Sequence, residues 1–221
     1  ITKRQIADQT TFDPYKSADQ NSWELMYDIY DTLFREEADG SYVPNLCTEY
    51  SFNEDGTELT MKLVEGVKFQ NGDVMTVDDV VFSLNTSIAS SFTTKFTSSM
   101  KEAVKVDDNT VKLVLKYAYA PVIGSLVNAT TSIVPKRVYE ADPEGFAQNP
   151  VGSGPYMLKE VVKGEKYVFE AFPDYFRGEA SIKNMICRVI PDNNAALMAL
   201  ESGELDVMQP NQDYSDRQAI E

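Results

Sequence analysis

The chain has 221 residues, and 20 Lys and Arg against 35 Asp and Glu give it a formal net charge of −15. It contains no histidine, which excludes imidazole-based zinc sites, Ser-His-Asp or Cys-His nucleophile systems and histidine acid–base relays. The acidic excess argues against binding to nucleic acid or to an anionic membrane surface, since both require Lys and Arg in excess.

The first predicted element is an amphipathic helix that begins near Trp23. Apolar residues recur at steps of three and four, and carboxylates occupy the opposite face (Trp23, Met26, Tyr27, Tyr30, Leu33 and Phe34; Glu24, Asp28 and Asp31). The three carboxylates could hold a metal ion, but an ordinary solvated face is the simpler interpretation. Asp39-Gly40-Ser41 then breaks the chain.

Three β-hairpins are predicted farther along the chain. Each pairs two strand-like segments across a short turn rich in Asp, Asn or Gly. The expected pairs are residues 47–52 with 58–64, 102–106 with 111–116, and 156–162 with 167–172. A further strand is expected at residues 186–190, and another starts at 205–208.

Two further helices carry capping signals. Thr76 can cap a helix whose apolar stripe runs from Val77 to Ile88, and Asp79 can complete a capping box. Asp192 or Asn193 can cap a helix that continues through Leu200.

Three segments read mainly as connections. Residues 87–99 are predicted to be a loop or a short helix, and residues 117–135 a buried loop with a short helix. The turn-rich residues 142–150 are the best candidate for a domain boundary.

Both cysteines lie in apolar or strand-like stretches. Cys47 follows Asn45-Leu46, and Cys187 follows Met185-Ile186. A buried free thiol is the expected state of each, and a single disulfide between them is the alternative.

Catalytic and metal-binding motifs are incomplete. Gly152-Ser153-Gly154-Pro155 contains a G-x-G, but the proline removes a backbone donor that a phosphate cradle would use. Ser98 and Lys101 spell S-x-x-K, the pattern of serine acyl-enzymes, without the partner motifs S-D-N and K-T-G. A calcium-like loop that begins at Ser51 has Lys62 where a bidentate Glu is needed. We therefore expect no enzyme, metal or cofactor, with Ser98 and Lys101 as a remote catalytic alternative.

About ten short phrases follow one another in a fixed order along the chain. They are Thr11-Phe12-Asp13-Pro14, Tyr30-Asp31-Thr32-Leu33, Val43-Pro44-Asn45-Leu46, Gly66-Val67-Lys68-Phe69 with Asn71-Gly72, Thr76-Val77-Asp78-Asp79-Val80-Val81-Phe82-Ser83, Tyr119-Ala120-Pro121, Ile133-Val134-Pro135-Lys136, Asn149-Pro150-Val151-Gly152-Ser153-Gly154-Pro155-Tyr156, Pro173-Asp174-Tyr175-Phe176 and Leu200-Glu201-Ser202-Gly203-Glu204-Leu205-Asp206. Together they resemble the family 5 extracellular solute-binding proteins, the dipeptide-, oligopeptide- and nickel-binding components of ABC importers. The resemblance covers essentially all 221 residues.

This resemblance implies a mixed α/β fold of the type II periplasmic-binding-protein class, in which this chain forms most of the first of two lobes. Residues 1–34 and 148–208 would form a central subdomain around a mixed sheet, and residues 35–147 an inserted α+β subdomain. Residues 209–221 would begin the crossover to a second lobe that lies outside this chain. Cys47 and Cys187 would then occupy different subdomains, which disfavours a disulfide.

The resemblance also implies a function. A peptide or another small solute would bind between the lobes, hinge closure would follow, and the solute would pass to the transmembrane subunits of an ABC permease. The protein would act as a monomer outside the cell or in the periplasm, tethered to the membrane as a lipoprotein, and would bind no nucleic acid. The rival hypothesis is a protein- or cell-wall-interaction module without a small ligand.

The resemblance places the ligand-binding loop between the Asp-Pro phrase and the first helix. Its residues are Ser17, Ala18, Asp19, Gln20, Asn21 and Ser22. Phe92, Phe96 and Thr131 lie where related proteins often place further pocket residues. Asp19 could face a cation or an amine, and the alternative is that it only caps the helix.

Overall fold

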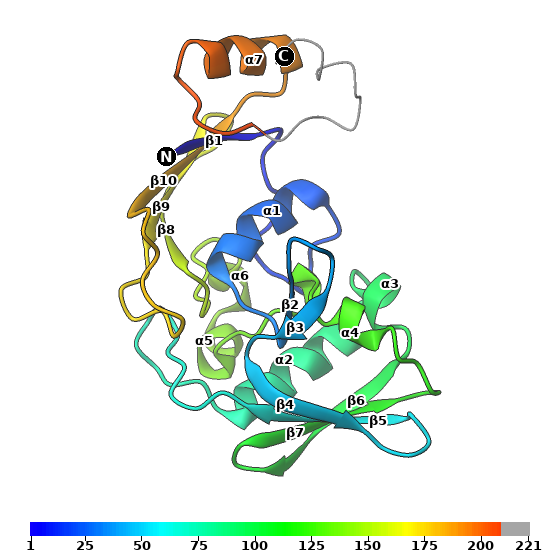
Figure 1. Ribbon diagram of the computed structural model, residues 1–221. Helices are drawn as coiled ribbons and strands as arrows, with labels where there is room; N and C mark the ends of the chain where they lie inside the picture. Colours follow the sequence, from blue (N-terminus) through cyan, green and yellow to red (C-terminus); the bar gives the residue numbers. More distant parts are fainter. Residues whose placement is uncertain (209–221) are drawn as a thin grey trace.

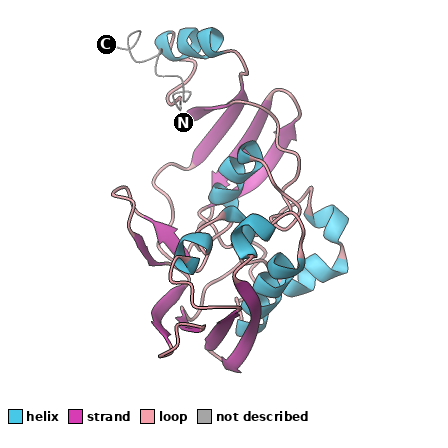
Figure 2. Ribbon diagram, turned by 90° about the vertical axis from the view of Figure 1, so that its right-hand side faces the viewer, coloured by secondary structure: helices cyan, strands magenta, loops and turns pink. Residues whose placement is uncertain are grey.

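The computed structural model describes residues 1–208, which contain two four-stranded sheets and a two-stranded ribbon (Figure 1). Figure 1 shows the two larger sheets at opposite ends of the main body, with most of the helices between them. The view turned by 90° shows the same layering (Figure 2). We refer to the sheet that contains β1 as the central sheet and to the one that contains β4 as the second sheet.

The central sheet joins strands from both ends of the described chain. Its order is β1 (Thr2–Gln5), β10 (Asn184–Val189), β9 (Lys166–Ala171) and β8 (Tyr156–Val162). β1 runs parallel to β10, whereas β9 is antiparallel to both of its neighbours, so the sheet is mixed as expected. The hairpin of β8 and β9 and the strand β10 confirm the sequence prediction. β1 has no such signal, since Thr-Lys-Arg-Gln lacks apolar alternation.

The second sheet is entirely antiparallel. Its order is β4 (Cys47–Phe52), β5 (Glu58–Leu63), β7 (Thr110–Leu115) and β6 (Met100–Asp107), which confirms two predicted hairpins. β2 (Phe34–Glu36) and β3 (Tyr42–Pro44) form the separate ribbon, which the sequence did not predict. α2 (Val77–Ala89) packs against the second sheet, and Thr76 and Asp79 form the expected capping box at its start.

Short helices fill the connecting segments. They are α3 (Thr94–Thr97), α4 (Val122–Ser125), the 3₁₀ helix η1 (Ala129–Thr131), α5 (Lys136–Ala141), α6 (Pro143–Phe146) and α7 (Asn193–Glu201). Asp192 caps α7 as predicted, and Gly203 beyond it has a φ of 78°. Val207 pairs with Lys3 through an isolated parallel bridge, in the segment where a strand start was expected. The predicted crossover at residues 209–221 lies outside the described residues.

The first helix is shorter than its apolar stripe predicted. α1 spans Gln20–Ile29, and the next residues are extended, so the prediction that the helix continues through Phe34 was wrong. The stripe residues beyond Ile29 are buried by tertiary packing instead: Tyr30, Leu33 and Phe34 are almost fully covered. At the end of α1, the Ile29 carbonyl oxygen accepts hydrogen bonds from the Gly154 N–H and from the Gln70 side-chain amide.

The proposed polar face of three carboxylates is not formed. Asp28 receives a hydrogen bond of 2.6 Å from the ammonium group of Lys3, and Asp31 lies beyond the helix in a buried position. Among residues 1–208, no group of three or more Cys, Asp or Glu side chains is arranged to hold a metal ion.

Each large sheet has its own hydrophobic cluster. The cluster of the central sheet includes Phe12, Met26 and Phe169, whereas that of the second sheet includes Leu59, Phe69 and Leu113. Val151 packs against both. Each fully buried Leu or Phe side chain contributes roughly 1.5–3 kcal/mol of transfer free energy. The division of the chain into subdomains at residues 34 and 148 remains a prediction.

Both cysteines are buried and free, as predicted. Cys47 lies in β4 and Cys187 in β10, so they belong to different sheets. Burial raises the pKa of the Cys47 thiol to about 11 and that of Cys187 to about 12, so both remain protonated at neutral pH. None of the helices in the described part combines the length and apolar composition that a membrane crossing requires.

Candidate functional site

The loop that the resemblance assigns to the ligand cleft leads directly into α1. Ala18 and Gln20 are exposed, Asp19 and Asn21 are partly exposed, and Ser17 is buried. Ser22 is buried, and its hydroxyl donates a hydrogen bond to the Asp19 carboxylate and accepts one from the backbone N–H of Thr10. The loop is therefore held at both ends by the buried residues Ser17 and Ser22, and the residues between them present backbone and polar side chains to solvent.

Asp19 is the N-cap of α1. Its carboxylate accepts hydrogen bonds from the backbone N–H of Ser22 at 2.9 Å, from the Ser22 hydroxyl at 2.8 Å and from the Thr10 hydroxyl. Burial alone would raise the pKa of Asp19, but these hydrogen bonds outweigh it and lower the pKa below its usual value. Asp19 therefore caps α1, and its carboxylate oxygens are already occupied by hydrogen bonds within the protein.

An aromatic contact connects α1 to α3. The rings of Trp23 and Phe96 meet edge to face, with 5.5 Å between their centroids. The Lys95 ammonium lies 5.5 Å from the Phe96 ring, at cation–π distance. Phe92 is 54% exposed in the preceding turn. Phe96, a predicted pocket residue, thus lies beside the helix that the predicted loop begins.

Thr131 occupies an interior position. It is buried in η1, which lies against α1, and its hydroxyl donates to the carbonyl groups of Ser125 and Asn128. The Thr131 hydroxyl is therefore used within the fold, and the ligand-binding role assigned to this residue remains a prediction.

Two polar atoms near the loop lack hydrogen-bond partners within the described residues. They are the buried Ser17 hydroxyl and the indole Nε1 of Trp23. A buried donor without a partner costs roughly 1–3 kcal/mol. Sequence periodicity assigned Trp23 only to the buried stripe of α1, so its polar edge was missed. The enrichment of Trp at binding sites is the one signal that could have drawn attention to it.

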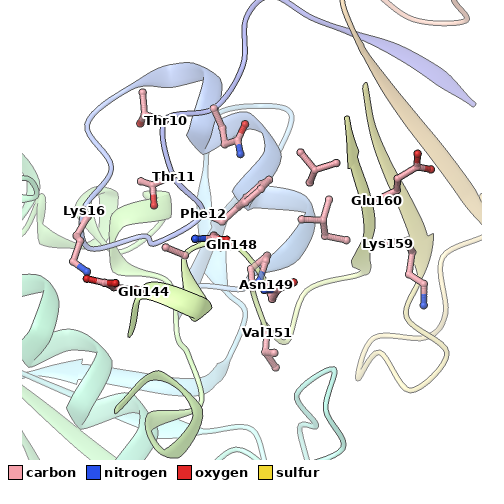
Figure 3. A pocket seen from close by; sticks show the side chains of 15 residues that line it. Thr10, Thr11, Phe12, Lys16, Glu144, Gln148, Asn149, Val151, Lys159 and Glu160 are labelled. Atoms are coloured by element: carbon pink, nitrogen blue, oxygen red, sulfur yellow. The ribbon is translucent and has the colours of Figure 1, made fainter. Parts of the chain in front are cut away.

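A hollow lies between the loop at Thr10–Phe12, the segment at Gln148–Val151 and the edge strand β8 (Figure 3). It measures about 820 Å³. Figure 3 shows Lys159 and Glu160 on the β8 side, opposite Thr10 and Thr11. Residues 17–22 are not part of its lining.

The serine–lysine alternative is not supported by geometry. Ser98 and Lys101 are both exposed, and the nearest carboxylate to the Lys101 ammonium is Glu102 at 3.5 Å. In the described part of the chain, no hydrogen bond joins the Ser98 and Lys101 side chains. Nor does the G-x-G motif form an anion cradle: Gly154 donates its N–H to the Ile29 carbonyl oxygen at the end of α1.

Comparison with known proteins gives one consistent family. Residues 41–220 match the bacterial extracellular solute-binding proteins, family 5 Middle. The probable D,D-dipeptide-binding periplasmic protein DdpA of Escherichia coli K12 is 29% identical over an alignment of 213 positions that covers 91% of this chain and 41% of that protein.

Two solved structures confirm the fold. Oligopeptide-binding AppA of Bacillus subtilis, in complex with a nonapeptide, superposes with a TM-score of 0.87 and 26% identity. MoaA of A. tumefaciens R10, in complex with mannopinic acid, superposes with a TM-score of 0.87 and 29% identity. Each alignment covers 99% of this chain but only 45% and 46%, respectively, of the other. The mixed α/β periplasmic-binding-protein fold is thereby confirmed, and the chain spans less than half the length of these relatives.

Proposed function

Because the chain belongs to the bacterial extracellular solute-binding proteins of family 5, which are binding proteins and not enzymes, we propose that it forms one wall of a cleft for a peptide-like solute. The opposite wall is proposed to come from the part of the fold that the relatives have and this chain does not span. In this proposal the full-length protein is the solute-binding component of an ABC importer.

The observation that carries the proposal is the surface at the start of α1. Its polar loop is open to solvent and stands beside the Trp23–Phe96 pair, and the Trp23 indole has a buried N–H without a partner. Binding sites for small molecules combine apolar walls with a few polar groups that fix orientation. A peptide backbone supplies N–H and carbonyl groups that the more exposed side chains of this loop, Gln20 and Asn21, can pair with.

Hinge closure is the proposed mechanism. A solute that contacts both walls binds the closed form more tightly than the open form, so it shifts the equilibrium toward closure. The closed form would then dock on the transmembrane subunits of a permease. We propose that this occurs outside the cell or in the periplasm, with the protein monomeric and tethered to the membrane.

Two of the relatives named above support a peptide-like solute without fixing its length, and the third has a different ligand. DdpA is named for D,D-dipeptides, AppA was solved with a nonapeptide and MoaA with mannopinic acid. For this chain we propose a peptide of two or more residues, held through its backbone by the loop at residues 17–22.

Calorimetry on the full-length protein tests the proposal. The probes are D-alanyl-D-alanine, a mixed nonapeptide and mannopinic acid. Replacing Trp23 by Ala is expected to weaken binding of the best probe about tenfold or more, as for a buried aromatic anchor. Tyr117→Ala is the matched control, because Tyr117 is 52% exposed and lies outside the loop and α3. Absence of binding by the unaltered protein would favour the rival, a protein- or cell-wall-interaction module.

A further inference from the structure

The two hydrophobic clusters meet at a tight backbone contact. Gly154 donates its N–H to the Ile29 carbonyl oxygen at 2.9 Å, where α1 ends. A Cβ atom on Gly152 would lie 2.0 Å from that oxygen, and one on Gly154 would lie 2.6 Å from the Ile29 carbonyl carbon. Only glycine allows the two backbones to approach this closely.

The side chain of Gln70 is inserted into this contact. Its Nε2 group lies within hydrogen-bond distance of three carbonyl oxygens: 3.1 Å from that of Ile29, 3.2 Å from Gly154 and 2.8 Å from Tyr156. Its Oε1 accepts the Gly152 N–H at 3.1 Å, and the Gln70 backbone N–H donates to the Gly152 carbonyl at 2.9 Å. An amide has two N–H donors and one carbonyl, so the whole group is used here.

Gln70 is fixed to the second sheet and α2. Its neighbours Val67 and Phe69 are fully buried in the cluster of the second sheet. The Met75 N–H donates to the Val67 carbonyl at 2.8 Å, which closes the loop, and α2 begins directly after Thr76. Because α3 packs on α2, Phe96 is expected to follow any displacement of Gln70.

The other half of the candidate site belongs to the central cluster. α1 buries Leu25, Met26 and Ile29 there, and it carries Trp23 at its exposed end. The distance between Trp23 and Phe96 therefore depends on how the two clusters are held together. Hydrogen bonds from Ser87 and Ser90 also cross between the parts, to Thr130 and Tyr15, so loss of one link should displace them without separating them.

We propose that Gln70 is a positioning residue for the ligand site: its amide fixes α2 and α3 relative to α1, and so fixes the aromatic wall relative to the loop at residues 17–22. The inference rests on the proposed function for its ligand, but its geometry can be tested separately. Gln70 itself lies away from the solute and acts through Phe96.

The test is Gln70→Met in the full-length protein, which keeps the length of the side chain and removes every amide bond. Nitroxide labels on cysteines introduced at Asp55 and Glu165, the exposed turns of the two sheets, report the distance between the parts by double electron–electron resonance. A broadened distribution of the distance between the two labels is expected. Binding of the mixed nonapeptide or D-alanyl-D-alanine should also weaken about tenfold, which is a typical effect of coupling between two sites.

Gln148→Met is the matched control, because Gln148 is an exposed glutamine on the connector and should change neither readout. Gln70→Glu is the second variant if the methionine variant fails to fold, since it keeps the acceptor for Gly152 and removes the donors. An unchanged distance and affinity with only a lower unfolding midpoint would overturn the proposal. If the unaltered protein binds neither probe, the proposed function fails, while the distance measurement still decides whether Gln70 positions the two parts.

Discussion

The two sheets differ in how far apart their strands lie in the chain. All four strands of the second sheet fall between Cys47 and Leu115: β4 with β5 and β6 with β7 pair through short turns, and β5 pairs with β7 across a longer connection. The central sheet instead pairs Thr2 with Ile186. Closing a long loop costs more chain entropy, and structures dominated by such contacts fold more slowly. The second sheet should therefore be the more autonomous part, and the central sheet the part that depends on distant contacts.

The central sheet depends on distant contacts chiefly at residues 152–154, just before β8. Gly152 and Gly154 contact the end of α1 and the Gln70 side chain immediately before the strand begins at Tyr156. A change here should disturb the central sheet more than the second sheet.

The largest effect is expected for Gly152→Ala. The added Cβ would overlap the Ile29 carbonyl oxygen, and backbone cannot move aside as a flexible side chain can. We expect a loss of more than about 3 kcal/mol in the free energy of unfolding, at the upper end of overpacking costs. Amide hydrogen exchange should accelerate in β8 and β9 more than in β5 and β7.

Gly164→Ala provides the control. Gly164 has a φ of 77° in the turn between β8 and β9, but nothing lies within 4 Å of its added Cβ. Only backbone strain remains, about 1–2 kcal/mol. Equal losses for the two variants, or equal acceleration in both sheets after Gly152→Ala, would contradict the picture of a dependent central sheet.

Asp31 gives a second test, because its carboxylate is hydrogen-bonded both to a residue beside the second sheet and to a residue beside the central sheet. It accepts hydrogen bonds from Asn45 at 2.9 Å, beside the second sheet, and from Ser153 at 3.4 Å, beside the central sheet. Burial raises its pKa from 3.8 to about 6, although hydrogen bonds from Asn45 and Tyr175 and the charge of Arg177 oppose this shift. Asp31 lines a second, smaller hollow together with Arg35 and Glu36.

The sign of the pH dependence follows from this shift. The folded state holds the proton more tightly than the unfolded state, so the stability due to Asp31 is fully present below about pH 4 and is lost as pH rises through about 6. The loss is about 2–3 kcal/mol. Urea unfolding between pH 4 and 8 should show it, and Asp31→Asn should remove this part of the profile because an amide does not titrate. A variant with the same pH profile as the unaltered protein would show that Asp31 is ionised throughout.

The same contrast explains what the sequence could predict. Hairpins, the Thr76 cap and buried cysteines are set by residues close in the chain, and these predictions were confirmed. β1, the ribbon of β2 and β3, and the end of α1 at Ile29 depend on partners far away. Tyr30 to Phe34 continue a helical stripe in sequence, but the Gly154 N–H and the Gln70 amide hold the carbonyl of Ile29 and the chain turns into extended structure.

The candidate site was predicted only as far as family resemblance reaches. The loop at residues 17–22 is exposed and polar where the resemblance places it, but periodicity treated Trp23 as core alone. The unpartnered indole and its contact with Phe96 arise from packing between segments more than 70 positions apart, which no local pattern encodes.

The smallest effect compares two helix caps. Thr76 caps α2, which packs against the second sheet, and Asp79 of the same capping box also accepts the Lys136 N–H at 2.9 Å. Asp192 caps α7, whose buried residues form only a small cluster with Leu205. Thr76→Ala should lower the global free energy of unfolding by about 1 kcal/mol, a typical capping contribution. Asp192→Ala should instead accelerate amide exchange within α7 and leave the global value nearly unchanged, because a helix with few buried contacts opens locally before the whole molecule unfolds. Equal changes in global stability would mean that α7 unfolds together with both sheets, and that the separation between a self-contained and a dependent part does not extend to this end of the described chain.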